Sequence, residues 1–237
     1  MSASIGWIQT ARRVVPSLLE LSRHVAPTWS HASVADLDAD ILAAAGVRGL
    51  VWDVDGTLMA HHAAVVDRAV RPRFEALLAD PRFRHAIVSN CQLPRFHQLG
   101  RMFPGIPVIL GFLTPDGPAY RVLQNGHESC SGPGGEHLCD SGSDVDPEGV
   151  RPMRKPSAEL VGEALRRLGL GESPASAVMV GDQHFTDVAS ANLAGMRSVK
   201  VETIDRASFP FPVRLSQRFE ALWVAGLGRL GMIRPRG

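Results

Sequence analysis

The chain has 237 residues, of which 45% are hydrophobic and 21% charged, and its formal net charge is +1. A chain of this length can bury a sizeable core. The near-neutral charge argues against a dedicated nucleic-acid binder, which concentrates basic residues on one face. Three cysteines are too few for a disulfide framework, no apolar run is long enough to span a membrane, and residues 1–16 lack a secretion signal. We therefore expect a soluble, cytoplasmic protein.

Short apolar runs alternate with helical patterns along the chain. Strands are predicted at 50–54, 86–88, 107–110, 177–180 and 198–201. Helices are predicted at 68–78, 93–102, 157–168 and 188–193, with Ser157 as an N-cap. This alternation predicts an α/β fold: a Rossmann-like three-layer α/β/α sandwich with a mainly parallel central sheet, formed as a single domain over residues 1–237.

Two acids follow the first predicted strand directly. Asp53 and Asp55 are separated by one residue and are followed by Gly56 and Thr57. A carboxylate can attack phosphorus as a nucleophile, and a second acid can serve the leaving group. Gly56 lets the backbone turn closely, so that this loop can bind phosphate oxygens. The alternatives are an acidic turn or a calcium-loop fragment, but a strand precedes these acids where a calcium loop would have a helix.

Polar residues also follow the second strand and precede the 157–168 helix. Ser89 and Asn90 end the second strand, where a hydroxyl and an amide can bind a phosphoryl group, although such residues commonly end strands. Lys155 can neutralise a transferring phosphoryl group, with Arg154 as the competing cation and a solvated basic loop as the alternative.

The fourth polar motif follows the strand at 177–180. Asp182 and Asp187 lie in Gly-Asp-Gln-His-Phe-Thr-Asp at 181–187. Asp182 is placed to complete a Mg²⁺ site, and Asp187 is either a further ligand or a group that positions one. Ligands in open parallel sheets bind outside the carboxyl ends of the strands, so we expect these motifs to meet there.

These motifs together resemble the haloacid dehalogenase superfamily of aspartyl-phosphate phosphatases. The resemblance is carried by DVDGT at 53–57, Ser89, Lys155 and GDQHFTD at 181–187. It is strongest toward the class IIIA branch that includes phosphatidylglycerophosphate phosphatases, on the stretches 26–50, especially 45–50, and 181–196.

The resemblance implies a role for each matching residue. Asp53 would be the nucleophile, and Asp55 the general acid and then the base that activates water. Ser89 and Lys155 would hold the phosphoryl group. Mg²⁺ would be bound by Asp53, the backbone carbonyl of Asp55, and Asp182. The chain departs from the branch at Gly56, where Asn is common, and in an insertion at 112–153.

The insertion has two interpretations. Its core at 125–149 is rich in Gly, Ser and Asp, which is typical of a flexible flap or small cap. The spacing H-x2-C-x6-H-x-C also offers four tetrahedral ligands for a structural Zn²⁺: His127, Cys130, His137 and Cys139.

The spacing of the motifs leaves no room for a large cap. The segment between Asp53 and Ser89 is short, and so is the insertion, so we expect an open site that accepts a phosphorylated small molecule or a lipid headgroup. Both ends of the chain mix apolar residues with arginines, as a helix at a membrane surface would, or as a helix packed on the sheet or on a second subunit. A phosphatase is the function expected; a scaffold that keeps the fold without turnover and a phosphotransferase are the alternatives.

Overall fold

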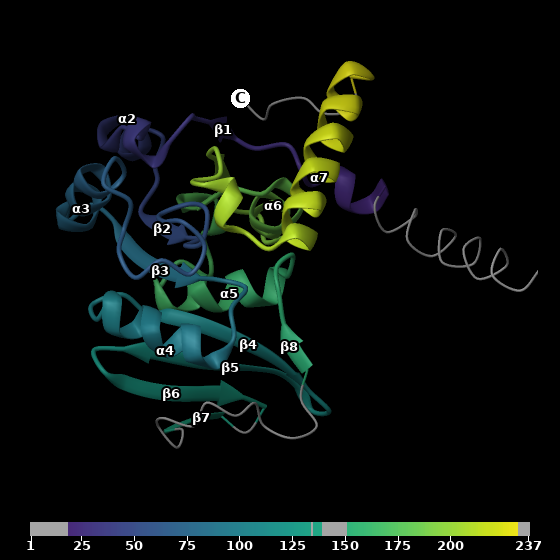
Figure 1. The fold of residues 1–237 in the computed structure, drawn as a ribbon. Helices are drawn as coiled ribbons and strands as arrows, with labels where there is room; N and C mark the ends of the chain where they lie inside the picture. Colours follow the sequence, from purple (N-terminus) through teal and green to yellow (C-terminus); the bar gives the residue numbers. More distant parts are fainter. Residues whose placement is uncertain (1–18, 134, 139–150, 232–237) are drawn as a thin grey trace, which may run out of the picture.

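The structure, a computed structural model, describes residues 19–133, 135–138 and 151–231. Its centre is a mixed sheet whose strand order is β1-β10-β9-β2-β3-β4-β5-β6-β7, with β8 paired to β4 (Figure 1). The strands are β1 (Trp29–Ser30), β2 (Gly49–Trp52), β3 (Arg84–Val88), β4 (Val108–Thr114), β5 (Gly117–Gln124), β6 (His127–Gly132), β7 (Gly135–Leu138), β8 (Arg151–Met153), β9 (Ala177–Gly181) and β10 (Arg197–Lys200). Pairing is parallel from β1 to β4 along this order and antiparallel for β5 to β8.

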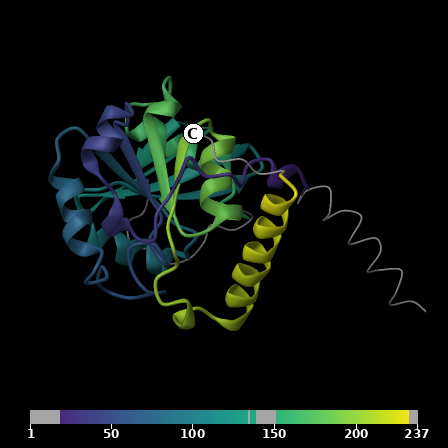
Figure 2. The ribbon, with the colours of Figure 1, turned by 90° about the horizontal axis from the view of Figure 1, so that it is seen from above.

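Helices cover both faces of this sheet (Figure 2). The structure contains helices α2 (Ala39–Ala44), α3 (Arg71–Ala79), α4 (Leu93–Met102), α5 (Ala158–Arg167), α6 (Ala189–Leu193) and α7 (Phe211–Arg229), of which α7 lies beside the layers, and shorter turns η1 (Val34–Asp36), η2 (Pro174–Ser176), η3 (His184–Val188) and η4 (Arg206–Ser208). The predicted three-layer α/β/α fold is confirmed.

Alternating strand residues divide the core between the two faces. Leu50 and Trp52 of β2 pack with α3 and α4, whereas Val51 between them packs with α5 and α6. Successive side chains of a strand point to opposite faces, so an apolar run buries residues on both. This is why the parallel strands appear in the sequence as short continuous apolar runs.

Helix α5 begins at the predicted capping residue. Ser157 accepts a hydrogen bond from the backbone N–H of Leu160, which confirms the predicted N-cap of α5. The helix predicted at 188–193 starts earlier, because η3 adds a turn of π-helix before α6.

The insertion is not irregular over its first half. Residues 114–132 extend the sheet as antiparallel strands β4, β5 and β6. Part of the expected flexible flap or small cap therefore forms strand β6 of the sheet, while residues 139–150 lie outside the described part of the chain. Among the helices that the structure describes, none has the length and apolar character needed to cross a membrane.

Candidate active site

Three acids meet at the carboxyl ends of neighbouring strands. Asp53 follows β2, Asp182 follows β9, and Asp187 lies in η3 directly after. All three are buried, and carboxylate oxygens of the three lie within 4.8 Å of one another. The structure thus brings together Asp53 and Asp182, the side chains predicted to bind Mg²⁺, and places Asp187 beside them.

Lys155 is the cation of this cluster. Its Nζ donates to Asp53 Oδ1 at 2.5 Å, to Asp187 Oδ1 at 2.6 Å and to the carbonyl oxygen of Val88 at 3.0 Å. The competing candidate, Arg154, is exposed. On the other side of the carboxylate, the hydroxyl of Thr57 donates to Asp53 Oδ2 at 3.1 Å. The Asp53 carboxylate is therefore held on both oxygens.

The end of β3 positions this lysine. The side-chain oxygen of Asn90 accepts from the backbone N–H of Lys155 at 2.7 Å, and its Nδ2 donates to the Lys155 carbonyl at 3.1 Å. The amide predicted to bind substrate is thus occupied in fixing the Lys155 backbone. Ser89 is buried beside it, and its hydroxyl has no hydrogen-bond partner among the described residues, so it is available to a phosphoryl oxygen.

Burial and mutual repulsion shift the ionisation of the cluster. Burial raises the pKa of Asp53 to about 7; Lys155 opposes this shift and Asp187 adds to it. Burial, together with Asp53 and Asp187, raises the pKa of Asp182 well above its ordinary value. Burial alone would lower the pKa of Lys155, but Asp187 and Asp53 outweigh it and raise that pKa. Three carboxylates around one ammonium leave an excess of negative charge.

Asp182 shows where a cation fits. Both of its carboxylate oxygens are buried, and neither has a hydrogen-bond partner of normal geometry in the described part of the chain, although Thr203 is near enough to lower its pKa slightly. A buried carboxylate without partners is unfavourable. Mg²⁺ takes oxygen ligands, so this donor set suits it. Asp187 differs, because its oxygens accept from Lys155 Nζ and from the backbone N–H of Gln183.

Two glycines allow the loops that follow β2 and β9 to come close to each other. Gly56 has φ +93°, and a Cβ there would stand 2.8 Å from Asp182 Oδ2. At Gly181 a Cβ would stand 2.3 Å from the Cβ of Asp187. Any larger residue at either position would separate the acids of the cluster.

The second acid of the first motif has a partner that the sequence analysis missed. Arg95 of α4 is buried, and its Nη2 donates to Asp55 Oδ1 at 2.6 Å. Its Nη1 donates to the carbonyl of Ala63 and to Gln98 Oε1, both at 2.8 Å. The same Asp55 oxygen accepts from the backbone N–H of His62 at 2.9 Å. Asp55 is thus oriented independently of the Asp53 cluster.

Helix α7 also reaches the site, which the sequence did not indicate. Glu220 accepts from the backbone N–H of His184 at 2.6 Å and from that of Phe185 at 3.2 Å, so it caps the start of η3. The ring of His184 points away from the acids, with Nδ1 at 2.9 Å from the carbonyl oxygen of Val25. His184 therefore contributes its backbone to the loop.

The structure contradicts the zinc hypothesis. Cys130 is disulfide-bonded, so it cannot supply the thiolate that the four-ligand set requires. His127 is exposed at the start of β6, and Cys139 lies outside the described residues. Cys91, by contrast, is free.

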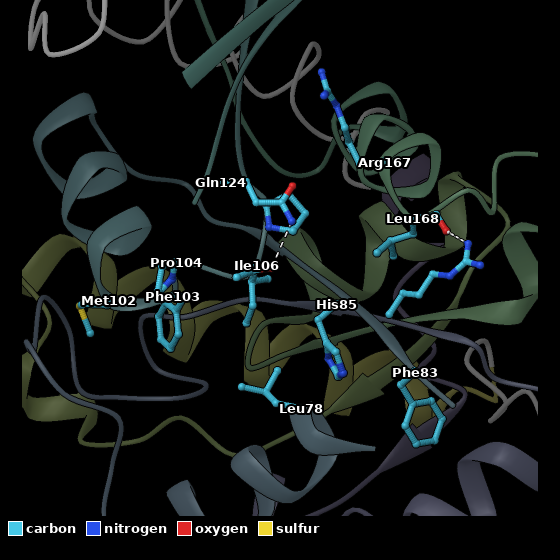
Figure 3. Close-up of a pocket in the computed structure, with 13 residues that line it drawn as sticks. Leu78, Phe83, His85, Met102, Phe103, Pro104, Ile106, Gln124, Arg167 and Leu168 are labelled. Atoms are coloured by element: carbon cyan, nitrogen blue, oxygen red, sulfur yellow. Dashed lines mark hydrogen bonds between the residues drawn. The ribbon is translucent and has the colours of Figure 1, made fainter. Parts of the chain in front are cut away.

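A separate cavity of about 530 Å³ opens at the opposite ends of the strands (Figure 3). It lies around the start of β3, and its lining includes His85, Phe103 and Gln124. Gln124 Nε2 donates across its edge to the Gly105 carbonyl at 3.1 Å. None of the predicted site residues lines it.

Comparisons with known proteins give one family match and two relatives of low identity. Residues 152–204 match the HAD-hydrolase-like family. The chain is 26% identical over 210 residues to phosphatidylglycerophosphate phosphatase 1, chloroplastic, of Chlamydomonas reinhardtii, covering 88% of this chain and 64% of that protein. It is 27% identical to phosphatidylglycerophosphate phosphatase 1, chloroplastic/mitochondrial, of Arabidopsis thaliana, covering 80% and 45%. A crystal structure of an uncharacterized protein from Listeria monocytogenes serotype 4b matches 64% of this chain and 76% of its own, at 20% identity and TM-score 0.37.

The fold, the motif acids and the match over residues 152–204 make the chain similar to the haloacid dehalogenase-like hydrolases. Among these hydrolases it is similar to phosphatidylglycerophosphate phosphatases. It spans less than two thirds of the length of these two relatives.

Proposed function

We propose that the chain is a Mg²⁺-dependent phosphomonoesterase that works through an aspartyl-phosphate. The observation that carries this proposal is the Asp53 carboxylate at the end of the central strand β2, held by Lys155 and Thr57 next to the buried, unpartnered Asp182. A scaffold would not need a nucleophile, a cation and an unpaired acid in one place.

In the first step a carboxylate oxygen of Asp53 attacks phosphorus, and the bond from phosphorus to the ester oxygen breaks. Asp55 donates a proton to the departing oxygen. In the second step a water oxygen attacks the same phosphorus while Asp55 takes a proton from it. The bond between phosphorus and Asp53 then breaks, which releases inorganic phosphate and restores the carboxylate.

The surrounding residues stabilise this transfer. The positive charge of Lys155, held beside Asp53, would stabilise the charge of the transferring phosphoryl group, and the free hydroxyl of Ser89 can donate from the end of β3. Mg²⁺, when bound, supplies positive charge that offsets the acids and the phosphoryl oxygens. Asp53, Asp182 and the backbone carbonyl of Asp55 would hold it. Arg95 keeps Asp55 turned toward the loop for proton transfer in both steps.

The proposed substrate class is a phosphate monoester on a lipid headgroup. Two relatives bear the name phosphatidylglycerophosphate phosphatase, and the lack of a large cap domain among the described residues suits a bulky substrate. A smaller phosphate ester would meet the same catalytic residues.

A phosphate-release assay tests the proposal. Wild type, Asp53→Asn and the exposed-acid control Asp116→Asn would be assayed with phosphatidylglycerophosphate in detergent and with an aryl phosphate, in Mg²⁺ and in EDTA. We expect Mg²⁺-dependent release that Asp53→Asn lowers by at least about 10³-fold and that Asp116→Asn leaves intact. Equal inertness of all three proteins would favour a scaffold, and phosphate transfer to added alcohols exceeding release would favour a phosphotransferase.

A further inference from the structure

Helix α7 carries large apolar residues on its outward side. Its side toward the domain buries Gln217, Glu220 and Leu227, which are 5%, 6% and 6% exposed. The opposite side presents Phe211, Leu215 and Leu222, which are 67%, 56% and 76% exposed. Residues at i, i+4 and i+11 lie on one stripe of a helix. A helix that only covers a core has the reverse pattern, so the outward stripe of α7 indicates a binding partner.

Arginines accompany this stripe. A depression of about 270 Å³ at the amino end of α7 is lined by Arg206, Arg214 and Arg218 together with Phe211 and Leu215, and no acid lines it. None of the three guanidinium groups forms a salt bridge within the described residues, and Arg214 Nε is buried without a hydrogen-bond partner. The surface is thus both apolar and cationic.

The segment that leads into α7 contacts the candidate active site. Phe209 Cζ lies 3.0 Å from the position that a Cβ of Gly56 would take. The backbone N–H of His61 donates to the Ser208 hydroxyl at 3.0 Å, and that of Ile204 to the Gly56 carbonyl at 2.7 Å. The segment that supplies Arg206 to the arginine-lined depression therefore also contacts the loop that carries Asp53.

We propose that the outward face of α7 docks on an anionic phospholipid bilayer, with the arginines at the phosphate groups and Phe211, Leu215 and Leu222 in the acyl boundary. This proposal rests on the proposed lipid-phosphatase function and adds the surface through which the enzyme would reach its substrate. Amphipathic helices with arginines beside an apolar face bind such interfaces.

Charge decides between a bilayer and a second copy of the chain. A twofold interface apposes the same patch on both subunits. On α7 that arrangement would bring Arg214 and Arg218 toward the same arginines of the other copy, without acids on that patch to compensate. An anionic lipid surface offers the opposite charge.

Vesicle sedimentation tests the docking surface without turnover. The full chain would be mixed with vesicles of phosphatidylcholine alone or with added phosphatidylglycerol, and the pelleted fraction measured at low and high NaCl. We expect binding to the anionic vesicles that weakens with salt. Arg214→Glu/Arg218→Glu should lower the partition coefficient by at least about 30-fold. Each basic residue near an anionic surface raises this coefficient about fivefold, and the variant also adds two negative charges. Phe211→Ser/Leu222→Ser should lower the partition coefficient as well.

The matched control is Arg68→Glu/Arg101→Glu, which makes the same charge change beside α3 and on α4, on the far side of the molecule from α7 (Figures 1 and 2). It should retain more binding than Arg214→Glu/Arg218→Glu, with circular dichroism confirming that each variant is folded. Equal binding by the two double variants, or absence of wild-type binding, would overturn the proposal. A dimer in sedimentation velocity that Phe211→Ser/Leu222→Ser dissociates would assign the surface to a second copy. Failure of the phosphate-release assay alone would leave this binding result standing.

Discussion

A negative charge on Asp182 is unfavourable in the metal-free protein. Its oxygens are buried without hydrogen-bond partners, and its pKa is raised by burial and by Asp53 and Asp187. A carboxyl whose folded-state pKa lies above its unfolded value binds protons more tightly in the folded state. Its contribution to stability therefore falls as the pH rises from the ordinary value toward the raised one.

The first prediction follows from this decrease in stability with rising pH. In EDTA, Asp182→Asn should unfold at a higher temperature than wild type, and the difference should be larger at pH 8 than at pH 5. An unsatisfied buried group costs about 1–3 kcal/mol, which corresponds to a few degrees in a chain of this size. Differential scanning fluorimetry at both pH values measures it. A variant that is less stable than wild type at pH 8 would contradict the account of Asp182.

The second prediction concerns the cation. Protons and Mg²⁺ compete for Asp53, whose pKa is raised to about 7, and for Asp182, so Mg²⁺ affinity should rise with pH. We expect MgCl₂ to raise the melting temperature of wild type, more at pH 8 than at pH 5.5, and to leave Asp182→Asn nearly unchanged. Saturation at 100 times Kd would add about 2.7 kcal/mol. An equal MgCl₂-dependent rise in the melting temperature of Asp182→Asn would show that Mg²⁺ binds elsewhere.

The third prediction concerns Arg95, which contacts the side chain of Asp55 and neither of the carboxylates, Asp53 and Asp182, that would hold Mg²⁺. Arg95→Lys keeps the positive charge but loses the forked geometry. We expect kcat on an aryl phosphate to fall by about 10–100-fold with KM little changed, because misplacing a catalytic group acts on the chemical step. The exposed Arg101→Lys on the same helix is the control. A change confined to KM would instead place Arg95 in substrate binding.

The sequence predicts those site residues that end strands, and it misses the residues that support them. Asp53 and Asp182 could be located because parallel strands end at one edge of the sheet, and Lys155 because it precedes the helix that begins after Ser157. Arg95 looked like a solvated helix residue, since its partner lies 40 residues earlier in the chain. Its position at the start of α4, directly after a strand end, is the only local signal. Side-chain contacts between segments that lie far apart in the chain produce no periodic pattern in the amino-acid sequence.

At the scale of single elements, α7 stabilises the loop that carries two of the acids. Glu220 accepts two backbone N–H groups at the start of η3, and its burial raises its pKa while those hydrogen bonds oppose the shift. The loop between Asp182 and Asp187 therefore depends on a helix that lies outside the sheet layers (Figure 1). A change in α7 can reach the acid cluster through this one side chain.

The fourth prediction tests that link. Glu220→Ala should lower the stability by about 1–3 kcal/mol, because two N–H groups lose their acceptor. It should also weaken Mg²⁺ binding, measured as the midpoint of the MgCl₂-dependent rise in melting temperature. Glu220→Gln, which keeps one acceptor oxygen, should lose less. The exposed Glu202→Gln serves as the control. An unchanged midpoint in Glu220→Ala would show that η3 holds its shape without α7.

The antiparallel extension shows why the insertion was misjudged. β5 and β6 bury an ion pair, in which Arg121 donates to Glu128, and His97 of α4 lies 3.3 Å from the other Glu128 oxygen. Charged residues at buried positions hide the apolar alternation that marks a strand. The Gly and Ser residues of β6 further weaken the strand signal, although backbone pairing to β5 holds the segment in the sheet.

At the scale of the whole molecule, the catalytic residues and the cationic face of α7 are connected through 204–209. Continuous contact from the Gly56 loop to Arg206 would let a protein resting on a bilayer keep its nucleophile near the headgroups. A water-soluble ester needs only the acid cluster. The two substrate types should therefore respond differently to the physical state of the lipid.

The last prediction separates them kinetically. Phosphatidylglycerophosphate would be dispersed in uncharged detergent micelles at constant bulk concentration while its surface fraction is lowered. We expect its hydrolysis to fall with surface fraction and to recover when anionic phospholipid is added, because docking depends on surface charge. Raising NaCl from 50 to 500 mM should abolish much of the recovery, since the Debye length shortens from about 14 Å to about 4 Å. Hydrolysis of an aryl phosphate in the same micelles is the internal control. If both substrates lose rate in parallel, detergent acts on the acid cluster itself, and lipid turnover does not depend on the α7 face.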